Sequence, residues 1–201
     1  MTIYRSCGKR TLDLVLAIIL LILLIPLLLG ISLWIIYESG KPVLFVQRRI
    51  GLHGKVFQIF KFRTMLGTPL ETNTGLNDAL RITRSGSFLR KTGLDEVPQL
   101  LNVIKGEMSI IGPRPLLEIY QSSLSEKQYE RHQVRPGITG LAQINGRNSI
   151  PWSEKFQWDL YYVYNISLKE DLAILIKTFF VVFSNKGTNF DDKTTMPPFT
   201  G

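Results

Sequence analysis

Residues 92–115 decide the fold of this chain and read TGLDEVPQLLNVIKGEMSIIGPRP. After two adjacent carboxylates, apolar residues recur with the spacing of one face of an α-helix, at Val97, Leu100, Leu101 and Ile104. Pro98 suits the first turn, where a backbone N–H has no helical partner, and Gly106 is typical of the position just past a helix end. The pattern predicts a short helix with Asp95 at or near its N-terminal cap.

The Asp95–Glu96 pair has two interpretations. A carboxylate at the start of a helix can cap free backbone N–H groups and interact favourably with the helix dipole. Basic residues, however, crowd the sequence on both sides of this pair: Arg81, Arg84, Arg90, Lys91 and Arg114. Acids surrounded by cations are typical of a site that binds a phosphorylated substrate and a metal ion. Arg114 also stands between two prolines, which restrict the backbone that presents its guanidinium.

The composition indicates an anionic partner. The 201 residues suffice for one modest domain, and the formal net charge is +8 with a pI near 9.7. Cys7 is the single cysteine, so an internal disulfide is excluded. Trp152 and Trp158 have acidic neighbours, unlike the basic and aromatic pattern of a nucleic-acid stacking surface. We therefore expect phosphorylated substrates and membrane phospholipid as partners, and no nucleic acid.

Leu14–Tyr37 is an apolar run of 24 residues, longer than the roughly 20 that span a bilayer as a straight helix. Pro26 interrupts its hydrogen-bond ladder near the middle. Basic residues flank both ends: Arg5, Lys9, Arg10, Lys41, Arg48 and Arg49. The positive-inside rule then favours a re-entrant helix with both ends in the cytoplasm, although a spanning helix remains open. Ser32 or Thr11 is expected to satisfy the carbonyl that the proline frees.

The next segment predicts a β-hairpin. Val43–Ile50 and Lys55–Phe62 are strand-like runs, and Gly51–Gly54 forms a four-residue connection between them. Lys61 and Arg63 would share one face of the second strand if it extends that far. They either guard a strand edge with charge or contact substrate. Residues 66–79 are polar and predict a loop.

The second half predicts helices and one glycine-rich connection. A helix follows Pro115, and Ser125 and Gln128 have the spacing of a capping box for the next. His132 is expected at the surface rather than in catalysis. The three glycines of Arg135–Asn148 suit either an ordinary connection or a nest of N–H groups that binds phosphate beside Arg147.

Two further helices and a tail complete the expected elements. Trp152–Tyr164 predicts an aromatic-rich helix. Leu172–Phe183 is apolar but too short to span a membrane, so it should pack on the domain or lie at the membrane interface. A polar tail begins at about Asn185.

Several of these segments together resemble the bacterial sugar transferases, the small monotopic phosphoglycosyl transferases that start glycan assembly on a polyprenyl phosphate carrier. The resemblance runs in family order nearly to Phe183 and rests on Lys61–Met65, Phe88–Lys91, Leu94–Ser109, Ile111–Pro115, Arg135–Gly140 and Asn145–Asn148. No single motif is specific, but the combination is. It points to the small, single-module type of the family.

The resemblance implies an α+β, mainly helical fold. Residues 1–40 would form a re-entrant membrane anchor, 41–184 a compact catalytic domain with a small antiparallel hairpin and amphipathic interface helices, and 185–201 a polar tail. The domain would lie on the cytoplasmic face of the bacterial inner membrane. The family's anchor helix breaks at a Ser-Pro pair, whereas this chain has Ile25–Pro26 and so lacks that hydroxyl.

The resemblance also assigns roles to residues. Asp95 matches the catalytic nucleophile and a ligand of Mg²⁺, and Glu96 matches its acidic partner. The positions expected to contact phosphates or shape the site are Lys61, Arg90, Arg114 and Arg147.

The implied reaction moves a sugar 1-phosphate from a UDP-sugar to undecaprenyl phosphate, releases UMP and passes through an aspartyl-phosphosugar. The donor would carry an N-acetylated amino sugar, and the step would open assembly of an O-antigen, capsule or glycoprotein glycan. Two alternatives remain: direct metal-assisted transfer without a covalent intermediate, and a non-catalytic membrane module that binds anionic lipids.

Overall fold

The computed structural model describes residues 4–67, 81–146, 149–184 and 199. Helices dominate these residues, as predicted, and the only sheets among them are two small two-stranded ones. Most of the predicted loop 66–79, the tail from Asn185 and Arg147 lie outside the described residues. The α-helices are α1 (Lys9–Ser39), α3 (Arg84–Thr92), α4 (Leu100–Lys105), α5 (Glu126–Tyr129), α6 (Leu141–Ile144), α7 (Trp152–Tyr164) and α8 (Leu168–Ser184).

Shorter helical turns and strands connect these helices. The 3₁₀ turns are η2 (Leu52–Gly54), η4 (Leu94–Gln99), η5 (Glu118–Ser123) and η6 (Glu130–Gln133), and a π-helical turn, η1 (Tyr4–Gly8), precedes α1. The strands are β1 (Leu44–Ile50), β2 (Val56–Phe62), β3 (Ser109–Ile111) and β4 (Gly137–Thr139).

The predicted hairpin is confirmed. β1 and β2 pair antiparallel, and Ile50 lies opposite Val56 beside the short η2 connection. Arg63 falls beyond the end of β2, so it does not share a strand face with Lys61. It donates instead to the carbonyls of Ser39, Gly40 and Lys41, where α1 ends. A second pair, β3 and β4, runs parallel.

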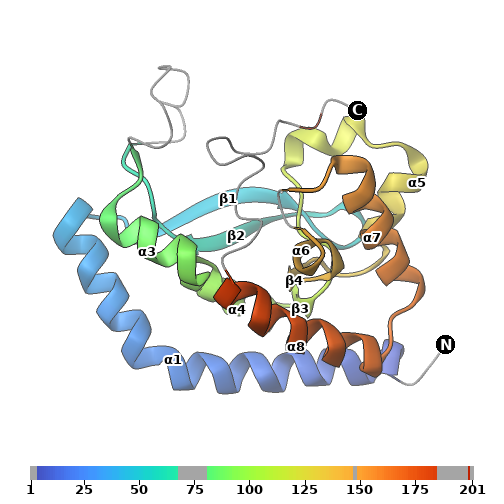
Figure 1. Cartoon of the computed structure of the whole chain (residues 1–201), viewed down its shortest axis with the longest axis horizontal. Coiled ribbons are helices and arrows are strands. Elements are labelled where there is room, and N and C mark those ends of the chain that lie inside the picture. Colours follow the sequence, from blue (N-terminus) through green and yellow to red (C-terminus); the bar gives the residue numbers. More distant parts are fainter. Residues whose placement is uncertain (1–3, 68–80, 147–148, 185–198, 200–201) are drawn as a thin grey trace.

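Helix α1 is one uninterrupted helix of 31 residues with Pro26 inside it, and it changes direction partway along its length (Figure 1). The expectation that Ser32 or Thr11 satisfies the carbonyl freed by the proline is wrong. Each hydroxyl donates to the carbonyl four residues before it, Ser32 to Leu28 and Thr11 to Cys7, because that acceptor is the nearest in its own turn.

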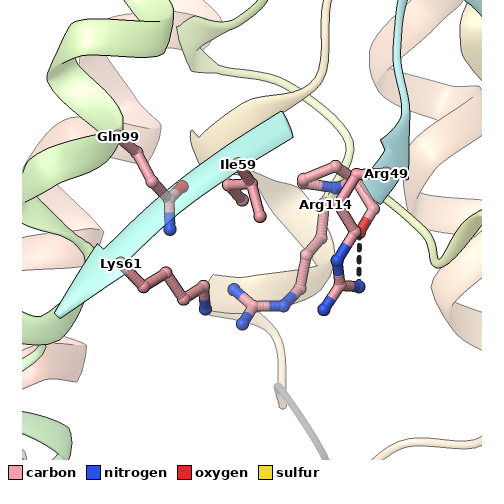
Figure 2. Close-up of a pocket in the computed structure, with 6 residues that line it drawn as sticks. Arg49, Ile59, Lys61, Gln99 and Arg114 are labelled. Atoms are coloured by element: carbon pink, nitrogen blue, oxygen red, sulfur yellow. Dashed lines mark hydrogen bonds between the residues drawn. The ribbon is translucent and has the colours of Figure 1, made fainter. Parts of the chain in front are cut away.

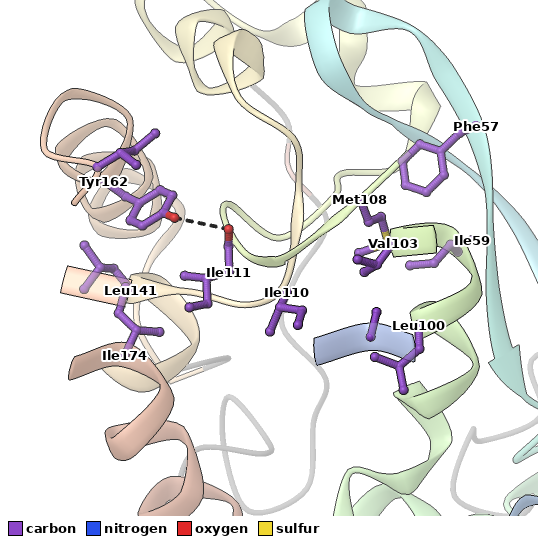
Figure 3. Close-up of a cluster of buried hydrophobic side chains, with 12 residues drawn as sticks. Phe57, Ile59, Leu100, Val103, Met108, Ile110, Ile111, Leu141, Tyr162 and Ile174 are labelled. Carbon is purple, nitrogen blue, oxygen red and sulfur yellow. Dashed lines mark hydrogen bonds between the residues drawn. The ribbon is translucent and has the colours of Figure 1, made fainter. Parts of the chain in front are cut away.

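The first half of α1 is part of the domain core. Ala17 is fully buried in the main apolar cluster, which joins residues of β2, α4, β3, α7 and α8 (Figure 3). Asp13 accepts a hydrogen bond from the backbone N–H of Ile110 in β3. Nearby, Asp171 of α8 accepts from Tyr4, Lys9 and Tyr162. These contacts tie α1 and α8 together on one side of the molecule (Figure 1).

The far end of α1 is also attached to the domain. Glu38 accepts hydrogen bonds from the backbone N–H groups of Arg84 and Ser85 at the start of α3. Between the two attachments the helix carries exposed apolar side chains, such as Ile22, Leu23 and Leu29. Helix α1 is the element long and apolar enough to cross a membrane among the residues that the structure describes.

The central helix begins near the predicted place but packs a different face inward. Its 3₁₀ turn η4 starts at Leu94 after Gly93 in the left-handed conformation (φ 71°), so Gly93 is the N-cap and Asp95 lies in the first turn, near the cap as predicted. Leu101 is 37% exposed, while Val103 is fully buried. The reason is that α4 packs against α1 and β2, and the face that meets them carries Leu100 and Val103. Gly106 does end α4, with φ 87°.

In the next part of the chain two predictions are confirmed and the one for His132 is wrong. The Ser125–Gln128 capping box is present, and α7 has the predicted bounds. His132, expected at the surface, is 4% exposed. Burial, and next the neighbouring Arg131, lower its pKa to about 4. The ring is therefore neutral near pH 7.

Helix α8 begins four residues before the predicted start, and it has one buried face and one exposed apolar face. Asp171 and Ile174 pack inside, while a row of large apolar side chains faces outward: Leu168, Leu172, Ile176, Phe179 and Phe180.

Candidate active site

The predicted acid–base cluster comes together from three separate segments. Asp95 and Glu96 stand in η4, Lys61 near the end of β2, and Arg114 in the turn after β3. β2 and η4 pack against each other, which brings Lys61 to Glu96 although 35 residues separate them. Figure 2 shows the Lys61 and Arg114 side chains converging from opposite sides.

Glu96 is held by two cations. Its Oε1 accepts from Lys61 Nζ at 2.6 Å and from Arg114 Nη2 at 2.8 Å. Burial alone would raise the pKa of Glu96, but the charges of Arg114 and Lys61 outweigh it and hold that pKa well below its usual range. Glu96 also raises the pKa of Arg114. The carboxylate is therefore ionised and fixed in place.

The turn that carries Arg114 is fixed by close backbone packing. The N–H of Gly112 donates to Thr139 O, and the N–H of Gly137 donates to Pro113 O, both at 2.9 Å. A Cβ on Gly137 would lie 2.0 Å from the Gly112 nitrogen, so only glycine fits there. The Gly137 N–H is therefore used within the fold and cannot contribute to a phosphate nest, which was one of the two alternatives for Arg135–Asn148. The Arg114 carbonyl accepts from the buried Arg131.

Asp95 is the free carboxylate of the pair. Among the described residues, no side-chain hydrogen bond or ion pair of Asp95 is found, in contrast to Glu96. Burial, and then the adjacent negative charge of Glu96, raise its pKa above the ordinary aspartate value, while Lys61, Arg114 and Arg90 oppose this shift. The two neighbouring carboxyl groups thus differ: one is neutralised by fixed cations and the other is available to a ligand.

Arg90 approaches the site from α3. Its Nε donates to Thr64 Oγ1 at 3.0 Å, and its charge lowers the pKa of Asp95. The structure therefore brings together Lys61, Arg90, Asp95, Glu96 and Arg114. The placement of Arg147 is not described.

Two residues at this site were not predicted. Arg49 and Gln99 line a pocket together with Lys61 and Arg114 (Figure 2). Gln99 had no local signal, because its place in the pocket depends on the packing of η4 on β2. Arg49 had no such signal: its position depends on the pairing of β1 with residues after Arg114, such as Ile50 with Leu116.

The described residues contain no group of three His, Cys, Asp or Glu that could hold a metal by itself. Asp95 could supply one oxygen ligand, and Mg²⁺ commonly takes its remaining ligands from water and substrate phosphates. The donor set therefore fits Mg²⁺ bound together with a diphosphate. The expected metal ligand is Asp95, since Lys61 and Arg114 occupy Glu96.

Comparison with known proteins identifies the family of this chain. The model of the family described as "Bacterial sugar transferase" matches residues 4–185, and the chain belongs to that family. An uncharacterized sugar transferase of Bacillus subtilis is 46% identical over 193 residues, 96% of each chain. The undecaprenyl-phosphate galactose phosphotransferase of Salmonella typhimurium is 39% identical over 197 residues, which cover 89% of this chain and 41% of that protein.

A third relative has the same coverage. The UDP-glucose:undecaprenyl-phosphate glucose-1-phosphate transferase of Escherichia coli is 42% identical over 189 residues, 89% of this chain and 40% of its own length. The chain thus spans about two fifths of these two longer relatives. The protein is a transferase, as the resemblance implied.

Proposed function

We propose that this protein transfers a sugar 1-phosphate from a UDP-sugar to undecaprenyl phosphate and releases UMP. The activities for which the Salmonella and Escherichia relatives are named support this general reaction. The observation that carries the proposal is the free Asp95 carboxylate beside an ionised Glu96 and three cations. Both substrates are anions, and the cations offset the repulsion between them and the carboxylates.

The proposed chemistry has two steps. An Asp95 carboxylate oxygen attacks the β-phosphorus of the donor, and the bond from that phosphorus to the bridging oxygen breaks, so UMP leaves with the electron pair. The product is an acyl phosphate that carries the sugar. An oxygen of the carrier phosphate then attacks the same phosphorus and regenerates the Asp95 carboxylate. Mg²⁺, when bound, would neutralise diphosphate charge.

The roles of the other residues follow from their contacts. Lys61 and Arg114 fix Glu96 and present positive charge to the phosphates, and Arg90 adds a third cation near Asp95. Glu96 holds both cations in position and does not exchange a proton, because its lowered pKa leaves it ionised. For the donor we propose an N-acetylated amino sugar, and for the pathway the first membrane step of glycan assembly.

We propose that the protein lies on the cytoplasmic face of the inner membrane with α1 re-entrant. Support comes from the exposed apolar middle of α1, the attachment of both its ends to the same domain, and the outward apolar row of α8. Burying such faces in lipid removes apolar area from water, which is favourable by about 25 cal/mol of free energy per Å² buried. This placement would bring a lipid carrier to a site that also draws a soluble donor from the cytoplasm.

The reaction is tested by leaving the carrier out. With UDP-sugar and Mg²⁺ alone, the enzyme should release UMP in a burst no larger than the enzyme concentration and retain labelled phosphosugar. Adding undecaprenyl phosphate should discharge the label and start turnover. If UMP appears only when both substrates are present and no adduct is trapped, direct transfer replaces the two-step proposal. If no UDP-sugar yields UMP under any condition, the protein is not this transferase.

The topology is tested with single cysteines in a Cys7→Ser background. Thr2→Cys and Lys41→Cys flank α1, and a re-entrant helix leaves both unlabelled by a membrane-impermeant thiol reagent in intact cells. Permeabilised cells provide the control, in which both should react. In a straight spanning arrangement the two positions lie on opposite sides, so strong labelling of Thr2→Cys alone in intact cells contradicts the re-entrant proposal.

A further inference from the structure

A small, solvent-open pocket lies between Lys61 and Arg114, the two cations that hold Glu96 (Figure 2). Its lining contains three cationic side chains and one amide: Arg49, Lys61, Arg114 and Gln99, with Ile59 and Pro115 between them. Asp95 is not part of this lining. Two of the cations already share Glu96, so its single negative charge leaves the lining positive.

Arg49 has only uncharged partners in the described structure. Its Nη1 donates to Pro115 O at 3.1 Å and its Nη2 to Gln47 Oε1 at 2.6 Å. Its buried Nε has no hydrogen-bond partner among the described residues. Burial, and then the neighbouring Arg114, lower the pKa of Arg49 to about 10. The charge of Glu96 opposes this shift, but Glu96 binds Lys61 and Arg114 rather than Arg49. A largely buried guanidinium whose hydrogen-bond partners are all uncharged is costly unless a ligand supplies negative charge.

Gln99 provides a second unfilled donor. The residue is 1% exposed, and its Nε2 lacks a hydrogen-bond partner among the described residues. In Figure 2 its amide points from η4 toward the space between Lys61 and Ile59. Leaving a buried N–H unpaired destabilises the folded protein, so a group of this kind at a pocket is typical of a ligand contact.

We propose that Arg49 and Gln99 bind a phosphate group through Arg49 Nε and Gln99 Nε2, and so extend the active site into a second phosphate subsite. The inference rests on the proposed function. Since Asp95 does not line the pocket, we assign its occupant to a phosphate other than the one that Asp95 attacks. Two phosphates remain: the α-phosphate of the donor, which leaves with UMP, and the phosphate of the lipid carrier.

Two variants test the subsite, each with a defined expectation. Gln99→Met keeps the length of the side chain and removes the amide, and Arg49→Met removes the guanidinium. Losing a hydrogen bond to a charged group should weaken binding of the phosphate by about 10-fold or more. Arg48→Met is the matched control, since Arg48 is the adjacent arginine on β1 but is mostly exposed and paired with Glu118. Its phosphate affinity should equal the parent's.

The measurements separate the two phosphate sources. UMP is titrated against the full-length, detergent-held protein by calorimetry, and KM is measured separately for UDP-sugar and undecaprenyl phosphate. Weaker UMP binding with a raised UDP-sugar KM places the donor α-phosphate in the pocket. A raised KM for undecaprenyl phosphate alone places the carrier phosphate there. Affinities and KM values within about twofold of the Arg48→Met control would overturn the proposal.

A stability measurement distinguishes binding from structural support. Because Gln99 Nε2 has no hydrogen-bond partner to lose among the described residues, Gln99→Met should unfold at the parent temperature or above it. Lower stability with unchanged affinities would make Gln99 a structural residue and overturn its proposed role. The UMP titration needs no turnover, so it still tests the pocket if the enzyme fails to transfer sugar phosphate, and the two proposals can fail independently.

Discussion

Asp95→Asn is expected to lower UMP release by about 10⁴-fold or more, a loss of the size seen when a covalent nucleophile is removed. Asparagine has nearly the same shape as aspartate but cannot form the acyl phosphate. The burst of UMP and the trapped phosphosugar should disappear with turnover.

The same substitution should leave stability almost unchanged. Asp95 makes no capping hydrogen bond, and Gly93 is the N-cap of its helical turn. Its raised pKa shows that ionised Asp95 is disfavoured in the folded protein, so removing the charge relieves repulsion from Glu96. The unfolding temperature should therefore equal the parent's or exceed it slightly.

The control is Glu126→Gln, another acid in the first turn of a helix, α5, at an exposed position. It should retain full activity. Activity of Asp95→Asn within about tenfold of the parent would remove Asp95 from the chemistry, whereas low activity together with a large loss of stability would make its role structural.

The sequence predicts the centre of the site because its signals are local. Asp95 and Glu96 are adjacent, and the prolines around Arg114 mark a restricted turn. Neighbouring cations in the sequence then indicate an anionic ligand. The structure adds which cation holds which acid: Lys61 and Arg114 both bind Glu96, and this leaves Asp95 free.

Contacts between distant segments could not be predicted in the same way. Gln99 looks like one polar residue within an amphipathic helix, and only the packing of η4 on β2 places its amide in a pocket. His132 was expected at the surface because a lone histidine in a charged segment usually lies there, but its ring is buried and meets the Tyr129 ring edge to face. Glu38 similarly has no sequence signal for its contact with α3, 46 residues away.

Helix boundaries were predicted less well than helix existence. Periodicity located α4, but it could not show that Gly93 in the left-handed conformation starts a tighter 3₁₀ turn before it. The face of α4 that meets α1 and β2 carries Leu100 and Val103, so Val103 enters the core and Leu101 stays partly exposed. Such a boundary depends on how Leu94 and Val97 pack against neighbouring elements, which a single sequence does not contain.

Arg131→Met should give the largest loss of stability among the substitutions considered. Arg131 donates Nε and Nη2 to Asp159 Oδ2 at 3.0 and 2.6 Å, and the two side chains are only 3% and 4% exposed. Removing one partner of a buried ion pair leaves an uncompensated charge and typically costs about 3–5 kcal/mol of unfolding free energy. The change should appear as a clear drop in the unfolding temperature of the detergent-held protein.

The loss should depend on pH in a predictable direction. Burial already raises the pKa of Asp159, and Arg131 opposes this shift, so its removal raises the folded-state pKa further. A carboxyl whose folded pKa exceeds its unfolded value destabilises the folded state as pH rises from the unfolded pKa, about 3.9, toward the folded one. The difference in unfolding temperature between the parent and Arg131→Met should therefore be smaller at pH 5 than at pH 7.5.

The control is the double variant Arg131→Met/Asp159→Leu, which removes both charges and should recover most of the lost stability, because an apolar pair of similar volume can replace a buried ion pair. Activity should not recover to the same extent. Arg131 Nη2 also donates to the carbonyl of Arg114 at 2.7 Å, and no methionine can replace that hydrogen bond. If the double variant regains stability but its KM for UDP-sugar stays raised, the result would show that Arg131 positions Arg114. A double variant as unstable as Arg131→Met would show instead that the methionine does not fit, and that the buried charge is not the cause of the loss.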